Sequence, residues 1–468
     1  MSEALPSLIC SESWYNRSQY RPRRESSGEW FLLPELDRDP AKELVDGRTQ
    51  GLASGVERAD SIRETYSGWS LPLSQEAEAN LTRLADNETR CVVTGQQPGF
   101  LGGPLYTIYK AVSAIAIARE LEAQTGRPHV PVFWVAGDDH DYDEIKTFRL
   151  GADQTFTLPG QGGRRPLATI PVDEPIEDVL ESVRIALKDM RYGERAIELC
   201  DLYRGRNLAS GFAAVLSELL GRFGLLILDP ERVRSLARPI FRRVIDDPVA
   251  ILAACERGAE LVAASGIPPF VRPRLPLFLV EPTDTGSLER HHLTWRDGSL
   301  AIDGGGRSLS QGELLTLVDE SPERFSPGAL LRPFVQEVAL GSLVTVGGPA
   351  ELGYFGQLPP IAESLELETP RSALRFHATL LFGAAAKAWD RLELDVDRFS
   401  QSGAPEDLLP AVGESGSLES AAAARSAMDR LQKAVSSDDT LDAGSVRQLS
   451  KSIRKMQESA EKVEQRLG

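Results

Sequence analysis

Residues 91–137 read CVVTGQQPGFLGGPLYTIYKAVSAIAIARELEAQTGRPHVPVFWVAG, and this stretch decides the predicted fold. It begins with a short β-rich run that ends in glycine. It closes with residues 129–137, in which both the odd and the even positions are mainly apolar, as expected of a strand covered on two faces. Between them lies a helical pattern, with apolar residues at Leu105, Ile108, Val112, Ile115 and Leu121. Strand, helix and strand in this order predict a βαβ unit with a right-handed crossover.

Two further segments extend this pattern along the chain. Residues 224–230, GLLILDP, have the composition of a buried strand, and residues 343–358, LVTVGGPAELGYFGQL, repeat the order of strand, glycine turn and helix. The sequence therefore predicts an α/β fold, with a Rossmann-like, doubly wound parallel sheet and helices on both faces. We assign residues 89–400 to this core.

The remaining segments predict additions to the core. Residues 1–88 read as a helical N-terminal extension. Insertions are expected near 146–215 and near 283–330, the second with Asp-Gly and Gly-Gly signals typical of a small β-hairpin. Residues 412–468 carry two apolar seams spaced by three and four around a polar turn, which predicts an antiparallel α-helical coiled-coil hairpin.

The composition limits the functional class. The chain has 468 residues, of which 41% are hydrophobic and 26% charged, and a formal net charge of −17, which argues against a nucleic-acid partner. The four cysteines lie far apart and form no CxxC pair, so neither a disulfide framework nor a structural zinc site is expected. We expect a cytoplasmic protein without a membrane partner, because no signal-peptide pattern or long apolar run occurs.

The first candidate binding segment is the turn that follows the strand at 91–95. Ligands of open α/β sheets bind beyond the carboxyl ends of the strands. The free amides of the helix that follows would attract a phosphate or carboxylate. The alternative is a tight structural turn, because glycine loops after a strand are common. The segment matches neither GxGxxG nor a phosphate loop, so it supports neither an NAD site nor a P-loop NTPase. The candidate binding residues are Thr94, Gly95, Gln96, Gln97, Gly99, Gly103 and Lys110.

The second candidate segment is the acidic loop after the strand at 129–135, which reads GDDHDYDEI at 137–145. Crowded carboxylates at a strand's carboxyl end suggest a general base, a clamp for a substrate ammonium, or ligands for magnesium. The alternative is a solvated turn that caps the next helix. One histidine among oxygen ligands is poor zinc chemistry, so we assign no metal residues. The candidate catalytic residues are Asp138, Asp139, His140 and Asp141.

The third candidate segment surrounds the strand near 343–347. Its GGPAE sequence resembles GGPLY at 102–106, so the two turns are expected to face each other across one crevice. Arg332 could bind a carboxylate or phosphate with two hydrogen bonds, or it could form a buried ion pair with a nearby acid. The candidate binding residues here are Arg332, Gln336, Gly347, Gly348, Glu351 and Tyr354.

Taken together, three motifs resemble the bacillithiol biosynthesis cysteine-adding enzymes over roughly residues 90–375. They are TGQQPGFLGGPLYTIYK, VPVFWVAGDDHDYDEI, and FSPGALLRPFVQEVAL with VGGPAELGYFGQL. The resemblance implies a Rossmann-like core with two insertions, a coiled coil and a homodimer. It also implies a ligase that attaches L-cysteine to the amino group of glucosaminyl malate, the final step of bacillithiol biosynthesis.

The candidate chemistry is compatible with that reaction. Amide formation needs an activated acyl group, so we expect ATP, accompanied by Mg²⁺, beside the substrates cysteine and glucosaminyl malate. Two other functions stay open at this point. One is a different ATP-using amide ligase or nucleotidyltransferase on the same fold, and the other is a non-catalytic nucleotide-binding scaffold.

Overall fold

The computed structural model describes residues 7–9, 52–150, 154–160, 162–266, 268–296, 299–303, 308–376, 379–381, 428–433, 435–436, 446 and 449–454. These residues belong to two compact units. The larger unit contains the described residues of 52–150 and 155–376. The smaller unit contains residues 7–9, 154, 379–381 and the described residues from 428 onward.

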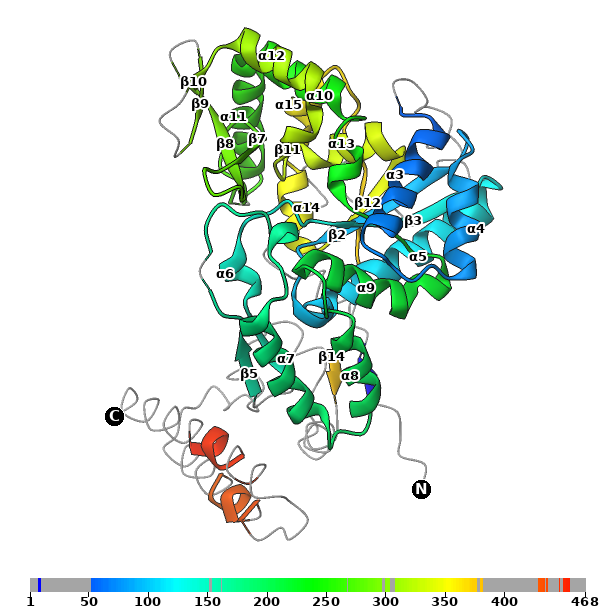
Figure 1. The fold of residues 1–468 in the computed structure, drawn as a ribbon, viewed down its shortest axis with the longest axis vertical. Helices are drawn as coiled ribbons and strands as arrows, with labels where there is room; N and C mark the ends of the chain where they lie inside the picture. Colours follow the sequence, from blue (N-terminus) through cyan, green and yellow to red (C-terminus); the bar gives the residue numbers. More distant parts are fainter. Residues whose placement is uncertain are drawn as a thin grey trace, which may run out of the picture. The chain divides into compact units, whose positions relative to one another are not determined.

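A five-stranded sheet forms the centre of the larger unit (Figure 1). Its strand order is β13-β12-β2-β3-β6, and every neighbouring pair is parallel. The bounds are Ser372–Leu374 for β13, Ser342–Gly347 for β12, Arg90–Gln96 for β2, His129–Val135 for β3 and Leu226–Leu228 for β6. The predicted parallel α/β fold is confirmed, and the three strands expected at 91–95, 129–137 and 224–230 all lie in this sheet.

The strand order places β2 in the middle of the sheet. Helix α5 (Leu105–Thr125) connects β2 to β3, and the chain later returns to add β12 on the other side of β2. The sheet therefore grows in both directions from β2. In sheets of this kind the ligand crevice lies where the winding direction changes, which here is at the carboxyl ends of β2 and β12.

Helices bury both faces of the central strands. Val92 packs in a cluster with Ala114 of α5, whereas Val93 belongs to the larger core with Ile62 of α3 (Gly55–Gly68) and Leu81 of α4 (Gln75–Leu84). Successive strand residues point to opposite faces, which explains why neighbouring valines join different clusters. Because helices cover both faces in this way, β2 is buried from Arg90 to Thr94, and its last two residues, Gly95 and Gln96, are partly exposed.

The buried face of α5 agrees with the predicted apolar pattern only in part. Ile115 and Leu121 are buried, but Leu105 and Val112 are 49% and 42% exposed. The buried face also carries small side chains, including Ala111, Ala114 and Ala118. Small residues let a helix lie close to the sheet, and a pattern of large apolar residues does not reveal this.

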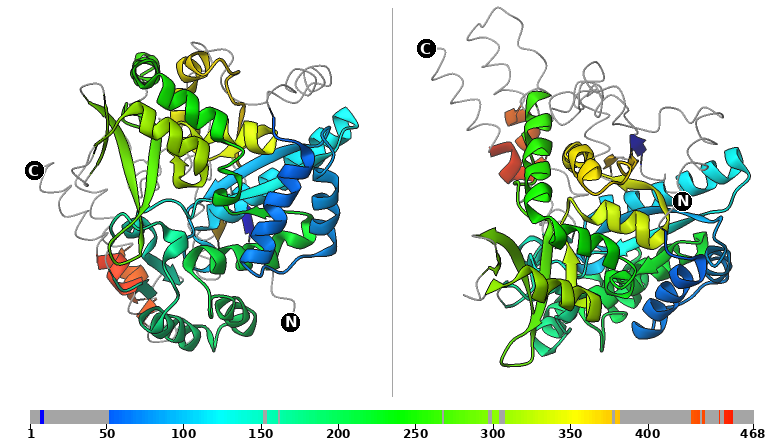
Figure 2. Two further views of the ribbon diagram at one scale, coloured as in Figure 1. Left: turned by 45° about the horizontal axis from the view of Figure 1, so that its top comes forward. Right: turned by 90° about the horizontal axis from the view of Figure 1, so that it is seen from above.

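A second five-stranded sheet is antiparallel and has the order β10-β9-β8-β7-β11 (Figure 2). Its bounds are Leu277–Pro282 for β7, Leu288–Arg296 for β8, Ser299–Ile302 for β9, Ser308–Leu309 for β10 and Phe325–Pro327 for β11. The element is larger than the small hairpin predicted near 283–330. The prediction missed β7 and β11, because β7 ends at Pro282, before the segment that was assigned to the hairpin, and β11 has only three residues.

Short elements and further helices lie between these strands along the chain. The segment after β3 contains β4 (Thr147–Leu150) and β5 (Gln154–Thr157), which pair with each other. The helices of this segment are α6 (Tyr142–Ile145), α7 (Glu174–Leu187), α8 (Gly193–Asp201) and α9 (Leu208–Leu220). The later helices are α10 (Arg238–Asp246), α11 (Pro248–Ala264), α12 (Gln311–Glu320), α13 (Arg332–Leu340), α14 (Pro349–Phe355) and α15 (Leu358–Ser364).

The smaller unit contains an antiparallel pair, β1 (Ser7–Ile9) with β14 (Thr379–Leu381). Its described residues from 428 to 454 are helical, and Met428, Val435 and Ile453 pack together. Most of residues 412–468 and residues 10–51 lie outside the described residues. The coiled-coil hairpin and the domain boundaries therefore stay predictions. Within the described residues, no helix combines the length and the apolar character that crossing a membrane requires.

Candidate active site

The loops that follow β2, β3 and β12 lie at one edge of the parallel sheet (Figure 1). Thr94 of β2 is opposite Val346 of β12 on one side and opposite Phe133 of β3 on the other. Since the three strands are parallel, their carboxyl ends point the same way. The structure thus brings together the three segments that the sequence pattern selected.

Lys110 lies at the centre of a cation-rich cluster at this edge. Its Nζ atom donates hydrogen bonds to the Gly95 carbonyl at 3.0 Å and to Gln96 Oε1 at 2.8 Å. It also forms an ion pair with the Glu351 carboxylate, and the lysine side chain is only 3% exposed. Glu351 in turn accepts a hydrogen bond from the Gly348 N–H at 2.9 Å. The glycine turn after β12 is therefore tied to the helix that follows β2.

Two arginines complete this cluster. Arg332 Nη2 donates to the Tyr354 hydroxyl at 2.8 Å and lies 3.8 Å from a Glu351 carboxylate oxygen. Arg375 also interacts electrostatically with Glu351, and its guanidinium lies 5.5 Å from the centre of the Tyr106 ring. We call Lys110, Arg332, Arg375 and Glu351 the cation-rich half. Three cations share one carboxylate there.

The ionisation of Glu351 follows from these neighbours. Burial alone would raise the pKa of Glu351, but the charges of Lys110 and Arg332 outweigh burial and hold this pKa below its ordinary value. Burial lowers the pKa of Lys110, and the Glu351 charge offsets part of that effect. Burial also raises the pKa of the Tyr354 hydroxyl, so it stays protonated at neutral pH.

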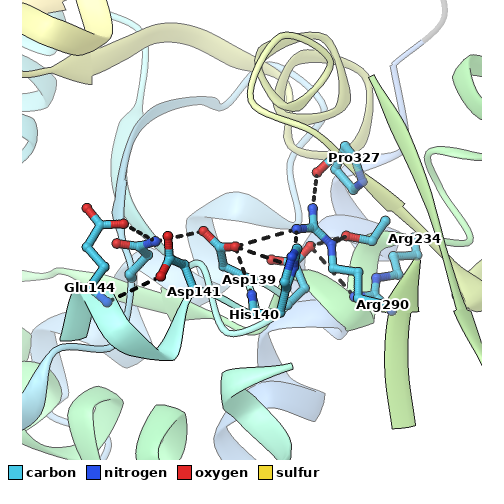
Figure 3. A network of polar contacts seen from close by, with 10 residues as sticks. Asp139, His140, Asp141, Glu144, Arg234, Arg290 and Pro327 are labelled. Atoms are coloured by element: carbon cyan, nitrogen blue, oxygen red, sulfur yellow. Dashed lines mark hydrogen bonds and ion pairs between the residues drawn. The ribbon is translucent and has the colours of Figure 1, made fainter. Parts of the chain in front are cut away.

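An acid-rich cluster lies on the other side of the turn (Figure 3). Gln97 Nε2 donates to Asp139 Oδ2 at 2.8 Å and to Glu144 Oε2 at 2.9 Å. Asp139 Oδ1 accepts from the His140 backbone N–H at 2.8 Å. We call Gln97, Asp139, His140 and Glu144 the acid-rich half. Burial would raise the pKa of Asp139, but Arg290 and the Gln97 amide together hold it below its ordinary value.

Asp138 is buried against the antiparallel sheet. Its Oδ2 atom accepts a hydrogen bond from Ser326 Oγ at 2.6 Å and lies 3.7 Å from Arg234 Nη2. Arg290 supports this contact, because its Nε donates to Ser326 Oγ at 3.0 Å and its Nη2 donates to the Pro327 carbonyl at 3.0 Å. Asp138 thus links the end of β3 to β11, and Figure 3 shows both arginines beside the acidic loop.

Three other predicted residues make hydrogen bonds that hold the local structure together. Asp141 Oδ1 caps α6 by accepting from the Glu144 N–H at 3.2 Å, which agrees with the capping alternative for that residue. Thr94 Oγ1 donates to the Val346 carbonyl at 2.9 Å. Gln336 Oε1 accepts from Thr345 Oγ1 at 3.3 Å, and both side chains are buried. Thr94 and Gln336 therefore hold neighbouring elements together.

The glycines of the first turn are explained by the turn itself. A Cβ atom on Gly99 would lie 2.8 Å from the Gly103 Cα atom, and Gly103 has a φ of +70°. Both positions therefore favour glycine without any ligand. Gly348 differs, because a Cβ atom there would project between Arg375 Nε at 3.4 Å and Glu351 Oε2 at 3.7 Å. That glycine leaves space beside the cation-rich half.

Sequence reasoning missed four residues of this region: Ser326, Arg234, Arg290 and Arg375. Arg290 lies in β8, within a stretch that was read as a hairpin, and no local pattern marks its side chain as part of the site. Ser326 belonged to a quoted motif, although its serine was not selected. These residues reach the loops through tertiary packing, so periodicity along the chain carries no signal for them.

A cavity of about 260 Å³ lies beside α6. Its lining includes Tyr142, Arg165 and Asp173, and none of the predicted site residues is among its lining residues. The Tyr142 hydroxyl already donates to the Pro159 carbonyl at 2.6 Å, and the Arg165 guanidinium donates to Thr169. We therefore place the candidate site at the sheet edge and not in this cavity.

A family model described as "Bacillithiol biosynthesis BshC, N-terminal Rossmann-like domain" matches residues 46–376. This range contains both sheets of the larger unit and both halves of the candidate site. The chain belongs to this family. The family that the three motifs predicted is thereby confirmed.

Individual relatives agree with the family match. A protein named "Putative cysteine ligase BshC" from Salinibacter ruber is 32% identical over 370 residues, which cover 73% of this chain and 63% of the relative. Proteins of the same name come from Heliobacterium modesticaldum, 32% identical over 69% of this chain and 60% of the relative, and from Symbiobacterium thermophilum, 30% identical over 79% and 71%. The chain thus spans about six tenths of the length of the first two relatives.

Proposed function

We propose that the protein is a ligase that forms a carbon–nitrogen bond between L-cysteine and the amino group of glucosaminyl malate, the last step of bacillithiol biosynthesis. Family membership and the names of the relatives support this proposal. The arrangement of charges at the sheet edge supports it independently.

The observation that carries the proposal is the pairing of two oppositely charged halves at one turn. Three cations surround Glu351 on one side, and Asp139 and Glu144 share the Gln97 amide on the other. Excess positive charge suits carboxylate or phosphate oxygens, and ionised carboxylates suit an ammonium group. A reaction that joins an acid to an amine needs both environments side by side.

The two halves suggest separate roles. Arg332 and Arg375 would bind the carboxylates of the malate group or the phosphates of ATP, since a guanidinium binds such oxygens with two hydrogen bonds. Asp139 and Glu144 would orient the amine, which must lose a proton before its nitrogen bonds to the acyl carbon. ATP would supply the activation of the cysteine carboxylate.

A magnesium ion would accompany ATP in this proposal. Among the described residues, no group of three or more His, Cys, Asp or Glu side chains has the geometry to hold a metal ion. Magnesium usually needs one or two protein carboxylates beside phosphate oxygens, and Asp139 and Glu144 are the residues of the acid-rich half with that chemistry.

The direct test incubates purified protein with glucosaminyl malate, ATP and a panel of amino acids, and detects amide products by mass spectrometry. We expect a product with cysteine and a loss of at least about 100-fold in kcat/KM for Asp139→Asn, which removes one ionised carboxylate near the amine. Equal use of other amino acids would favour another amide ligase. ATP binding without any product would favour the non-catalytic scaffold.

We also propose that residues 412–468 form the helical hairpin through which two copies associate. The packing of Met428, Val435 and Ile453 supports helical pairing in this region. Light scattering of the full chain and of a variant ending at residue 411 tests this. A dimer that persists after truncation would contradict the proposal.

A further inference from the structure

His140 is the histidine of the acid-rich half, and its side chain is 32% exposed. Its Nδ1 atom lies 3.4 Å from Arg290 Nη1 in a hydrogen-bonding geometry. A guanidinium is always protonated and can only donate, so Nδ1 must be the acceptor. The proton of the neutral ring is then on Nε2. Within the part of the chain that the structure describes, Nε2 makes no hydrogen bond.

Arg290 cannot readily turn away from His140. Its side chain is buried, and two other nitrogen atoms are held by Ser326 Oγ and the Pro327 carbonyl, each at 3.0 Å. The guanidinium also lies 3.7 Å from the centre of the Phe278 ring, and the centres of the Phe278 and His140 rings are 6.1 Å apart in an edge-on arrangement. The antiparallel sheet therefore presents Arg290 to His140 in a fixed position (Figure 3).

The charged group that competes for this atom is Asp139, whose Oδ1 lies 3.8 Å from Nδ1, farther than Arg290 Nη1 and beyond hydrogen-bond distance. Asp139 and Asp141 of the same loop favour a protonated ring, whereas burial and the Arg290 charge disfavour it, and Arg164 adds a weaker effect of the same sign as Arg290. The balance lowers the pKa of His140 below its ordinary value. The ring is therefore neutral at neutral pH, with Nδ1 already occupied.

We propose that Arg290 is a positioning residue that fixes the Nε2–H tautomer of His140, so that His140 donates a hydrogen bond to an anionic oxygen of the substrate. This inference rests on the proposed function for the identity of that oxygen, a carboxylate or phosphate oxygen. Such a donor stabilises the negative charge that develops when an acyl group is attacked. The amine proton then goes to a carboxylate and not to His140.

The first test measures the tautomer directly. Long-range ¹⁵N–¹H spectra of histidine-labelled protein distinguish the two neutral tautomers, and loss of a signal in His140→Gln assigns the ring. We expect Nε2–H in the unsubstituted protein, and a mixture of tautomers with a raised pKa in Arg290→Met. An Nδ1–H ring in the unsubstituted protein would overturn the proposal, whether or not the variant folds.

Arg164→Met is the matched control for this test. Arg164 Nη1 lies 3.0 Å from Nδ1 of His291, a different histidine with the same kind of arginine contact. We expect Arg164→Met to change the His291 signals and to leave the tautomer of His140 unchanged. If Arg164→Met also gave a mixture of His140 tautomers, the tautomer would be set by nearby positive charge in general and not by the contact with Arg290.

A kinetic test distinguishes a role of His140 as hydrogen-bond donor from a role as general base. The amide nitrogen of Gln reaches about as far as Nε2 of His, whereas that of Asn lies nearer the position of Nδ1. A donor role predicts that His140→Gln keeps kcat within about tenfold and His140→Asn loses about 100-fold or more. Equal losses would indicate a base. If the unsubstituted protein forms no amide, the proposed function is wrong. The tautomer of His140 is measured without the reaction, so its result tests the role of Arg290 independently.

Discussion

Gln96 and Gln97 are adjacent in sequence, yet their side chains bond to oppositely charged halves of one site. Gln96 Oε1 accepts from Lys110 Nζ at 2.8 Å, and Gln97 Nε2 donates to Asp139 and Glu144 at 2.8 and 2.9 Å. Gln96 is the last residue of β2, where successive side chains point in opposite directions. A single peptide bond therefore separates the cation-rich half from the acid-rich half.

Replacing Gln97 should change the ionisation of Asp139. We expect Gln97→Met to raise the pKa of Asp139, because the amide donor that stabilises the ionised carboxylate is lost. The folded-state pKa of Asp139 is depressed, so its stabilising effect exists above the unfolded pKa and disappears as pH falls through the folded value. In the variant this loss begins at a higher pH. Carboxyl ¹³C titration by NMR measures the shift.

The control for that titration is Gln311→Met. Gln311 also donates two hydrogen bonds through its amide, but to the carbonyls of Ile245 and Asp246. The pKa of Asp139 should stay at its original value in this variant. An unchanged Asp139 titration in Gln97→Met would contradict the role assigned to the amide.

Replacing Glu351 should destabilise the folded protein. In Glu351→Gln the cations Lys110, Arg332 and Arg375 would stay close together without a carboxylate. Breaking a buried ion pair in this way costs about 3 kcal/mol or more. Urea unfolding at pH 7 measures the loss. Glu363→Gln is the control, because that side chain is 80% exposed, and it should change the free energy of unfolding by less than about 0.5 kcal/mol.

The cost of Glu351→Gln should also depend on pH. The folded-state pKa of Glu351 is depressed, so its contribution is fully present above the ordinary glutamate pKa and is lost as pH falls through the lower folded value. The difference between the two proteins should therefore shrink in acid. A difference that stayed constant down to the acid transition would rule out this electrostatic origin.

Asp138 and Ser326 should be energetically coupled. Their hydrogen bond of 2.6 Å joins a buried carboxylate to β11, and bonds to charged groups contribute about 1.5–3 kcal/mol. A double-mutant cycle of Asp138→Ala and Ser326→Ala should give a coupling energy of at least about 1 kcal/mol in urea unfolding. The exposed pair Asp60 and Arg63 is the control and should couple by less than about 0.5 kcal/mol. Simple additivity at Asp138 and Ser326 would refute this prediction.

Three glycine-to-alanine variants should separate steric crowding from backbone strain. Gly99→Ala would bring its Cβ within 2.8 Å of backbone, so we expect a loss of about 1–3 kcal/mol in the free energy of unfolding. Gly126 has a φ of +69° and open space, so its variant should lose about 1 kcal/mol from strain alone. Gly163→Ala causes neither a close contact nor backbone strain, so it should leave the free energy of unfolding nearly unchanged. If Gly99→Ala were as stable as Gly163→Ala, the packing explanation for the turn would be wrong.

The strands β2, β3, β6 and β12 and the helix α5 were predictable because their patterns are local. A short apolar run between turn residues predicts a buried strand, and a glycine and proline cluster predicts a tight turn. The buried face of α5 was harder to predict, since Ala114 and Ala118 pack on the sheet while the larger Val112 is exposed. Helical periodicity ranks large apolar residues first, whereas close packing on a sheet favours small ones.

The sequence by itself determined the parallel sheet, its glycine turns and the presence of an acidic loop at a strand end, because each depends on residues that are neighbours along the chain. Tertiary structure alone decided which partners those residues meet. Arg290 is 150 positions from His140, and Ser326 is 188 from Asp138. Such contacts arise only when the antiparallel sheet packs beside the loop, since long-range hydrogen bonds leave no periodic trace in the sequence.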